Sequence, residues 1–109
     1  MDTHIEMLLD SYPEKVVEIF NNLRQMIFEC ASIEPEEKLW ARLPSYYVGD
    51  RFVRLIPFKD HINIESGEIM AHRQEVLGYK ITPKGMLQIY VKQDIPYEVL
   101  QKIFIKALG

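Results

Sequence analysis

Apolar residues recur at helical spacing along the first third of the chain. From Glu14 to Ala31 an apolar stripe advances by four and three positions, and a polar stripe follows the opposite side. Two interleaved stripes of this period predict an amphipathic helix with one buried face. The apolar stripe consists of Val16, Phe20, Leu23, Ile27 and Cys30, and the polar stripe of Glu14, Glu18, Asn21, Gln25 and Glu29.

Three further segments are expected to be helical. Apolar residues on one side of residues 2–9 predict a short N-terminal arm. Asp94-Ile95-Pro96 opens a helix that continues to Leu108, because proline is well tolerated in a first helical turn. Residues 68–77 predict a third, short helix.

Between the helices the pattern changes to a period of two, which predicts strands. Ile62 and Ile64 alternate with polar residues over 61–65, as in a strand with one buried face. Strand-forming residues also fill 44–48, 51–57 and 86–91, with turns at 49–50 and 59–60. Residues 35–43 are interpreted as a connector with at most one helical turn.

Strands joined by two-residue turns must be antiparallel, which sets the predicted fold class. We expect one α+β domain over residues 1–109, with N-terminal helices, an antiparallel sheet of about five strands and a C-terminal helix. The helices are expected to cover one face of the sheet.

Composition indicates a cytoplasmic globular protein that contacts no membrane. The chain has 109 residues, 48% of them hydrophobic, and a single cysteine, Cys30. A lone thiol excludes a disulfide within the chain and fits a reducing compartment. No apolar run reaches the ~18 residues of a membrane span, and the first residues lack the basic start of a signal peptide.

The charges are unevenly distributed. Residues 1–37 contain nine acids and two bases, a net charge of −7, whereas residues 38–109 contain seven acids and eleven bases, a net charge of +4. This division argues against nucleic-acid binding by the whole surface. The acidic segment can attract a cation or a basic protein partner. The alternative is an ordinary solvated helix face.

Short motifs in a fixed order give the chain a family resemblance. In this order the chain contains Pro44-Ser45-Tyr46, Phe58-Lys59-Asp60-His61-Ile62, Gly78-Tyr79-Lys80, Lys84-Gly85 and Ile95-Pro96. In these motifs the chain resembles the YdhG-like family, a bacterial domain of unknown function that is compared with frataxin-like and YjbR/CyaY-like proteins. The resemblance covers nearly the whole chain. It implies a helix–sheet–helix fold with about five antiparallel strands and an iron-handling role.

Six carboxylates are the candidate ligands of a cation. Acids spaced by four residues lie on one helix face and can share a hard cation whose shell water completes. The same spacing also occurs on any solvated helix. The candidates are Asp10, Glu14 and Glu18 along the first long helix and Glu34, Glu36 and Glu37 beyond its far end. Iron is the metal that the resemblance implies.

A lysine-containing loop is the candidate site for an anion. Tyr79, Lys80, Lys84 and Gly85 place two bases around a glycine, an arrangement that can hold a phosphate or carboxylate. The alternative is a turn in which the glycine permits a positive φ and the lysines maintain solubility.

His61 is a candidate metal ligand or general base, with Asn63 and Glu65 on the same strand face. Asp60 is expected on the opposite face, and Cys30 is expected to be packed in the core. No nucleophile, base and orienting group occur together. The leading hypothesis is therefore a non-enzymatic binding or adaptor domain. The second is a small-molecule or anion-binding domain that uses residues 79–85 and the sheet face.

The C-terminal helix carries apolar residues beside its polar face. Ile105 lies there with Tyr97 and Leu108 at the edge, which indicates a contact patch. The chain is expected to be a monomer or a weak homodimer. The alternative is that Ile105 packs on the N-terminal arm.

Overall fold

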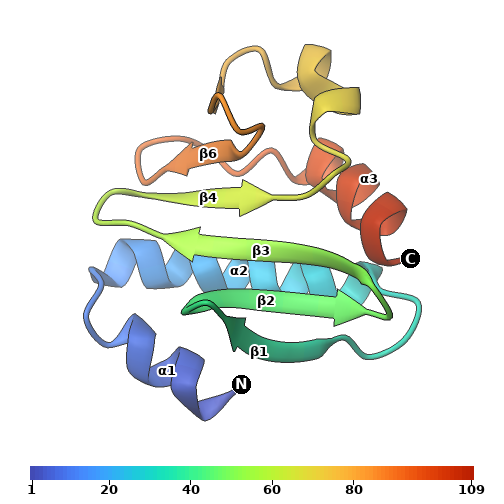
Figure 1. Cartoon of the computed structure of the whole chain (residues 1–109). Helices are drawn as coiled ribbons and strands as arrows, with labels where there is room; N and C mark the ends of the chain where they lie inside the picture. The colour runs from blue at the N-terminus through green and yellow to red at the C-terminus, as the bar shows by residue number, and fades with distance from the viewer.

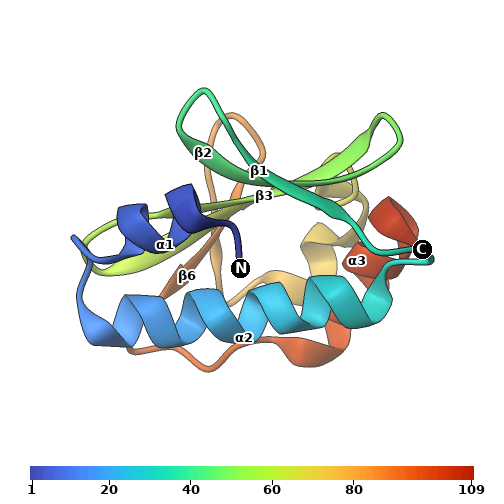
Figure 2. The same ribbon diagram turned by 90° about the horizontal axis from the view of Figure 1, so that it is seen from below.

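Six antiparallel strands form a single sheet, and the long helices lie against one side of it (Figure 1, Figure 2). The structure is a computed structural model that describes residues 1–109. The helices are α1 (Thr3–Leu9), α2 (Glu14–Cys30), the 3₁₀ helix η1 (Met70–Val76) and α3 (Tyr97–Leu108). The strands are β1 (Glu36–Trp40), β2 (Leu43–Val48), β3 (Arg51–Pro57), β4 (His61–Glu65), β5 (Lys80–Ile81) and β6 (Leu87–Tyr90). Their order across the sheet is β1-β2-β3-β4-β6-β5. The predicted α+β class is confirmed.

One apolar core fills the space between the sheet and the helices. The inner-face residues of β4, Ile62 and Ile64, are fully buried, as their alternation predicts. The α2 stripe is buried from Val16 to Ile27, whereas Cys30 is only partly buried at the edge of the core. The inward residues of α3 are all buried: Leu100, Ile103, Phe104 and Ala107.

The first strand contradicts the expected connector over residues 35–43. Residues 36–40 form β1, which pairs with β2 from Glu36 opposite Tyr47 to Trp40 opposite Leu43. A two-residue turn joins these strands, and both of its residues have positive φ, +49° at Ala41 and +67° at Arg42. The pattern missed β1 because Glu and Lys are poor strand formers, and such turns normally contain Asn-Gly.

The N-terminal arm packs on the core as α1. Ile5 is fully buried and Leu9 nearly so, which anchors one side of the helix. The carboxylate of Asp2 caps its start by accepting a hydrogen bond from the Ile5 amide at 3.0 Å. The arm therefore has a fixed position relative to α2 and β1.

The other side of the sheet, here called the outer face, points away from α2 and α3 (Figure 2). It displays alternate residues of each strand, among them Trp40, Tyr47, Phe52, Arg54 and His61. The molecule therefore has a helical layer and an open sheet face. None of the helices combines the length and apolar character required to cross a membrane.

Candidate functional site

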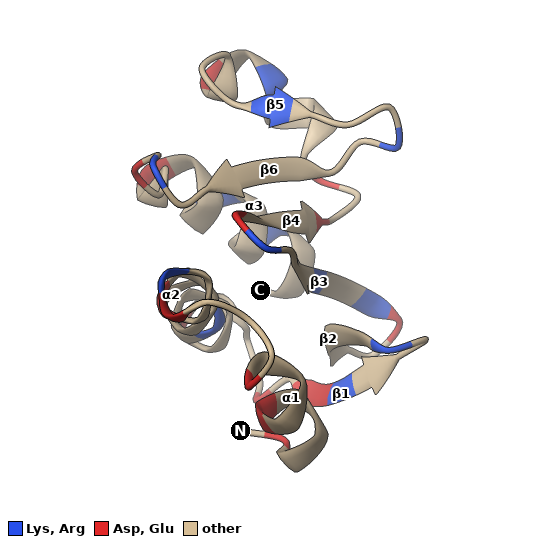
Figure 3. Cartoon of the chain, turned by 90° about the vertical axis from the view of Figure 1, so that its left-hand side faces the viewer, with Lys and Arg blue, Asp and Glu red and all other residues tan.

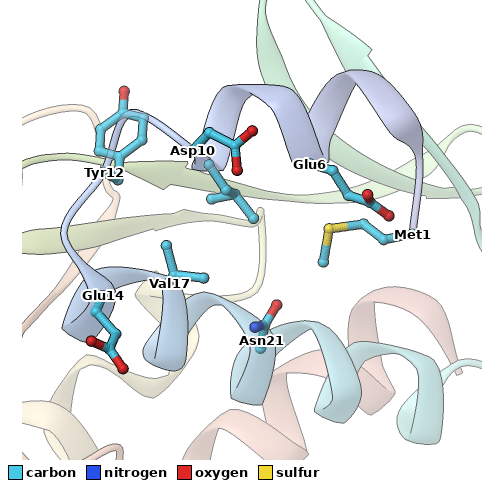
Figure 4. Close-up of a pocket in the computed structure, with 8 residues that line it drawn as sticks. Met1, Glu6, Asp10, Tyr12, Glu14, Val17 and Asn21 are labelled. Atoms are coloured by element: carbon cyan, nitrogen blue, oxygen red, sulfur yellow. The ribbon is translucent and has the colours of Figure 1, made fainter.

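A groove with an acidic rim lies between α1 and α2 (Figure 4). Its volume is about 550 Å³. Four of the lining residues are apolar or aromatic and three are carboxylates, and none has a basic side chain. The lining residues are Met1, Glu6, Leu9, Asp10, Tyr12, Glu14, Val17 and Asn21.

The packing of α1 determines which side chains reach this groove. Because Ile5 and Leu9 anchor the arm, Glu6 and Asp10 extend from α1 toward the space above α2 (Figure 4). On the opposite wall, Glu14 begins α2 and Val17 follows one turn later. Two helices thus bring together carboxylates that the sequence separates by up to eight positions.

The acidic side chains of the groove have no basic side chain as a partner. Glu6, Asp10 and Glu14 are exposed, and none forms an ion pair. Several carboxylates around a partly apolar floor attract a cation that carries an apolar group. The arrangement therefore fits binding of a positively charged organic group.

The six predicted cation ligands do not lie together. Asp10 and Glu14 reach the groove, but Glu18 and Glu34 are exposed elsewhere. On β1, Glu36 pairs with Lys38 at 3.4 Å. No group of three or more His, Cys, Asp or Glu side chains in the chain can hold a metal ion.

Glu37 joins three elements and is not available to a ligand. Its side chain is only 9% exposed and is bound by the Arg24 guanidinium, with Nη2 at 3.1 Å from Oε1. The Asp2 amide donates to the same oxygen at 2.8 Å. Burial raises the pKa of Glu37, but the hydrogen bonds from Arg24 and Asp2 outweigh it and lower the pKa overall. Glu37 therefore connects α1, α2 and β1.

The loop that contains the predicted anion site uses its amides internally. Gly85 has φ +87°, and its N–H donates to the Thr82 carbonyl at 2.8 Å. The next amide, of Met86, donates to the Thr82 hydroxyl at 3.1 Å. These amides form a closed turn, so they do not provide the backbone cradle that an anion site requires.

The side chains of that loop are divided between structure and solvent. The Tyr79 hydroxyl donates to the Asp94 carbonyl at 2.5 Å, and burial and the Asp94 carboxylate raise the pKa of Tyr79. Lys80 and Lys84 are exposed and form no ion pair. Of the four predicted anion-site residues, only these two lysines remain free to meet a negative charge.

His61 is fully engaged by its neighbours. Its ring stacks between Phe58 at 4.5 Å and Tyr90 at 4.6 Å. Nδ1 lies 2.7 Å from the Asp60 carboxylate, and Nε2 lies 3.4 Å from the Gln88 amide nitrogen. The expectation that Asp60 faces away was wrong, because Asp60 belongs to the turn before β4. Both nitrogens and both ring faces are occupied, which suits a structural histidine.

A buried arginine on the outer face was not predicted. Arg54 is 6% exposed, and its guanidinium lies 4.1 Å from the Trp40 ring and 3.8 Å from the Phe52 ring. Trp40 itself is 51% exposed. Recognising this cluster from the sequence requires β1, because only the β1–β2 pairing places Trp40 over β3.

Polar contacts fix the same guanidinium. Arg54 donates from Nε to the Ser45 hydroxyl at 3.0 Å and from Nη2 to the Tyr47 hydroxyl at 3.1 Å. Its Nη1 lies 3.3 Å from the Glu65 carboxylate. The positive charge is therefore compensated within the fold, and the surrounding rings are held in fixed positions.

A second groove, of about 480 Å³, separates α2 from α3. Ile105 and Tyr97 line it and are about half exposed, as the expected contact patch requires. Leu108 is fully buried, so its inclusion in the patch was wrong. Ile105 faces Met26 and Cys30 of α2, which contradicts packing on the N-terminal arm.

Comparisons with protein-family models, with curated proteins and with solved structures found no match to this chain.

Proposed function

We propose that this protein is a non-enzymatic binding or adaptor domain whose α1–α2 groove holds a lysine- or arginine-containing segment of a partner protein. The observation that supports this function is the set of three unpaired carboxylates around a partly apolar groove. The charged group of the partner's lysine or arginine would lie at the acidic rim of the groove. The aliphatic part of that side chain, or a neighbouring apolar side chain, would pack against Val17 and Leu9.

An organic cation suits this groove better than a metal ion. A hard metal ion needs several oxygens that converge on one point at about 2–2.6 Å. The groove carboxylates are not arranged as such a group. A flexible ammonium or guanidinium group tolerates a wider spacing, because long-range attraction and local hydrogen bonds both contribute.

A protein segment is favoured over a free amine because the lining residues extend along both helices, from Met1 to Asp10 and from Tyr12 to Asn21 (Figure 4). A volume of about 550 Å³ accommodates more than one side chain. We also place the protein in the cytoplasm, which the lone thiol of Cys30 supports.

The test is an amide-resolved NMR titration of the whole chain with a synthetic lysine–leucine peptide. We expect saturable shifts centred on residues 6–21 and no such shifts with a glutamate–leucine peptide of equal length. The double variant Glu6→Gln/Asp10→Asn should weaken binding about tenfold, since each lost charge contact contributes up to about 1 kcal/mol. Glu18→Gln is the matched control, because Glu18 lies on α2 outside the groove lining.

Absence of shifts, or equal weakening by Glu18→Gln, would contradict the proposal. Ferrous iron added under anaerobic conditions tests the role that the family resemblance implies. Saturable iron binding that is lost in Glu14→Lys/Glu18→Lys would favour the iron hypothesis over the peptide.

A further inference from the structure

We propose that the outer face of the sheet is a second binding surface, which takes an acidic segment of a partner protein. The surface comprises the exposed parts of Trp40 and Tyr47, the β1–β2 turn with Arg42, and the 82–86 loop with Lys84. It lies on the side of the sheet opposite the helices, away from the acidic groove (Figure 2).

The β1–β2 turn, the β2–β3 turn and the 82–86 loop project from the sheet on this side (Figure 2). The β1–β2 hairpin and the 82–86 loop both extend away from α2, and each carries a base near its tip (Figure 3). Arg42 and Lys84 are exposed and form no ion pair with any carboxylate. The projections place free positive charges at two sides of the outer face.

Most of the other acids near the outer face are paired with bases. Glu36 and Glu65 are each paired, with Lys38 and Arg54. Lys80 lies opposite Gln88 in the β5–β6 ladder and has no acidic partner. Asp50 in the β2–β3 turn and Asp60 beside His61 have no lysine or arginine partner, but the unpaired bases Arg42, Lys80 and Lys84 outnumber them. The excess of bases is complementary to a carboxylate-bearing partner.

The apolar part of the surface has the composition of an interface core. Tryptophan, tyrosine and arginine are the residues that most often dominate binding energies. Trp40 is half exposed, yet its ring is held 4.1 Å from the Arg54 guanidinium, which polar contacts fix in turn. A partner would therefore meet an ordered ring and lose little side-chain entropy on binding.

The turn that carries Arg42 is strained. Ala41 and Arg42 both have positive φ, a conformation that is favourable for asparagine and glycine and unfavourable for other residues. Residues held in such conformations cluster at functional sites. This turn places the exposed Arg42 side chain at the tip of the hairpin.

The outer face has no described cavity at its aromatic cluster, and most of its ring faces are already covered. Four main cavities of about 200–550 Å³ are present, and none of these four is lined by Trp40, Tyr47 or Arg54. Single-stranded nucleic acid needs ring or guanidinium faces on which bases stack. Here His61 is stacked on both faces, Lys38 lies 4.9 Å from the Tyr47 ring and Arg54 lies against Phe52. Trp40 is therefore the one half-exposed ring of this surface, whereas single-stranded nucleic acid stacks on several.

Trp40, the only tryptophan in the chain, is a natural reporter for the test. The whole chain is titrated with a glutamate–phenylalanine peptide, with a lysine–phenylalanine peptide and with oligothymidylate of equal length. We expect a saturable change of Trp40 fluorescence with the acidic peptide, together with NMR shifts at residues 38–54 and 82–86. The other two probes should not produce this change.

The double variant Arg42→Glu/Lys84→Glu should bind the acidic peptide about tenfold more weakly. The matched control Lys15→Glu/Lys106→Glu alters the net charge equally but lies on α2 and α3, and it should change affinity less than twofold. Circular dichroism verifies that both variants are folded. An unresponsive Trp40, equal weakening in both double variants, or stronger binding of oligothymidylate would overturn the proposal.

Discussion

Two adjacent glutamates on β1 have different roles because successive side chains of a strand point to opposite faces. Glu36 lies on the outer face, exposed and beside Lys38. Glu37 lies on the inner side, where Arg24 and the Asp2 amide bind it. The sequence pattern grouped the two as equivalent cation ligands, since it did not identify the strand that separates them.

We predict that Glu37→Ala lowers the free energy of unfolding by about 2–3 kcal/mol at pH 7, because it leaves Arg24 partly buried without its partner. The pKa of Glu37 is lowered in the folded state. Its contribution is therefore complete above the unfolded pKa of about 4.3 and is lost as the pH falls from there through the folded pKa. Urea denaturation at pH 7 and pH 3 measures both effects.

At pH 3 the difference between wild type and Glu37→Ala should be smaller than at pH 7. Glu36→Ala serves as the neighbouring control and should change stability by less than about 0.5 kcal/mol. An equal effect of the two substitutions would show that Glu37 does not link α1, α2 and β1.

At the scale of elements, periodicity predicted the parts that bury a regular face. The bounds of β3 and β4 agree with the structure, and α2 differs by a single residue at its end. β1 and the two-residue β5 were missed, because they are defined by pairing with β2 and β6 rather than by their own residues.

The candidate groove was predictable only in part. Asp10 and Glu14 were expected to meet a cation, and both line the groove. Glu6 and Tyr12 were not predicted to line this groove. The angle between α1 and α2 brings them to it, and no local sequence pattern encodes that angle. The Arg54 cluster depends in the same way on the pairing of β1.

The strain of the β1–β2 turn makes a prediction about stability. Ala41→Asn should raise the free energy of unfolding by about 0.5–1 kcal/mol, since asparagine adopts positive φ more readily than alanine does. Thermal and urea denaturation provide the measurement. Ala71→Asn, at an exposed position of η1, is the control and should not stabilise the protein. If neither substitution raised the free energy of unfolding, the turn would not be strained and the prediction would be wrong.

At the scale of the whole molecule, the acidic groove and the unpaired bases of the outer face lie on opposite sides. The groove carboxylates belong to the helical layer, and the unpaired bases Arg42, Lys80 and Lys84 belong to the sheet side (Figure 3). An adaptor with this arrangement can hold a basic and an acidic partner at once without forcing their charges together.

The α2–α3 groove leads to a prediction about association. Ile105→Asp should change the free energy of unfolding by less than about 1 kcal/mol, because half of the side chain is exposed, whereas Ile103→Asp should unfold the protein. If the wild type forms a weak homodimer at high concentration, light scattering should show its loss in Ile105→Asp. Self-association that persists in this variant would exclude the groove as the contact.

The position of α3 has a consequence for synthesis on the ribosome. All six strands precede α3 in the chain, yet α3 supplies six buried side chains that cover β3 and its neighbours. The Leu108 carbonyl also accepts a hydrogen bond from the Ser32 amide at 3.0 Å, and this bond joins α3 to the end of α2. While α3 is still being translated, apolar residues of the inner face such as Val53 and Leu55 therefore lack part of their cover. We expect chaperones that recognise exposed apolar strands to bind the nascent chain during that interval.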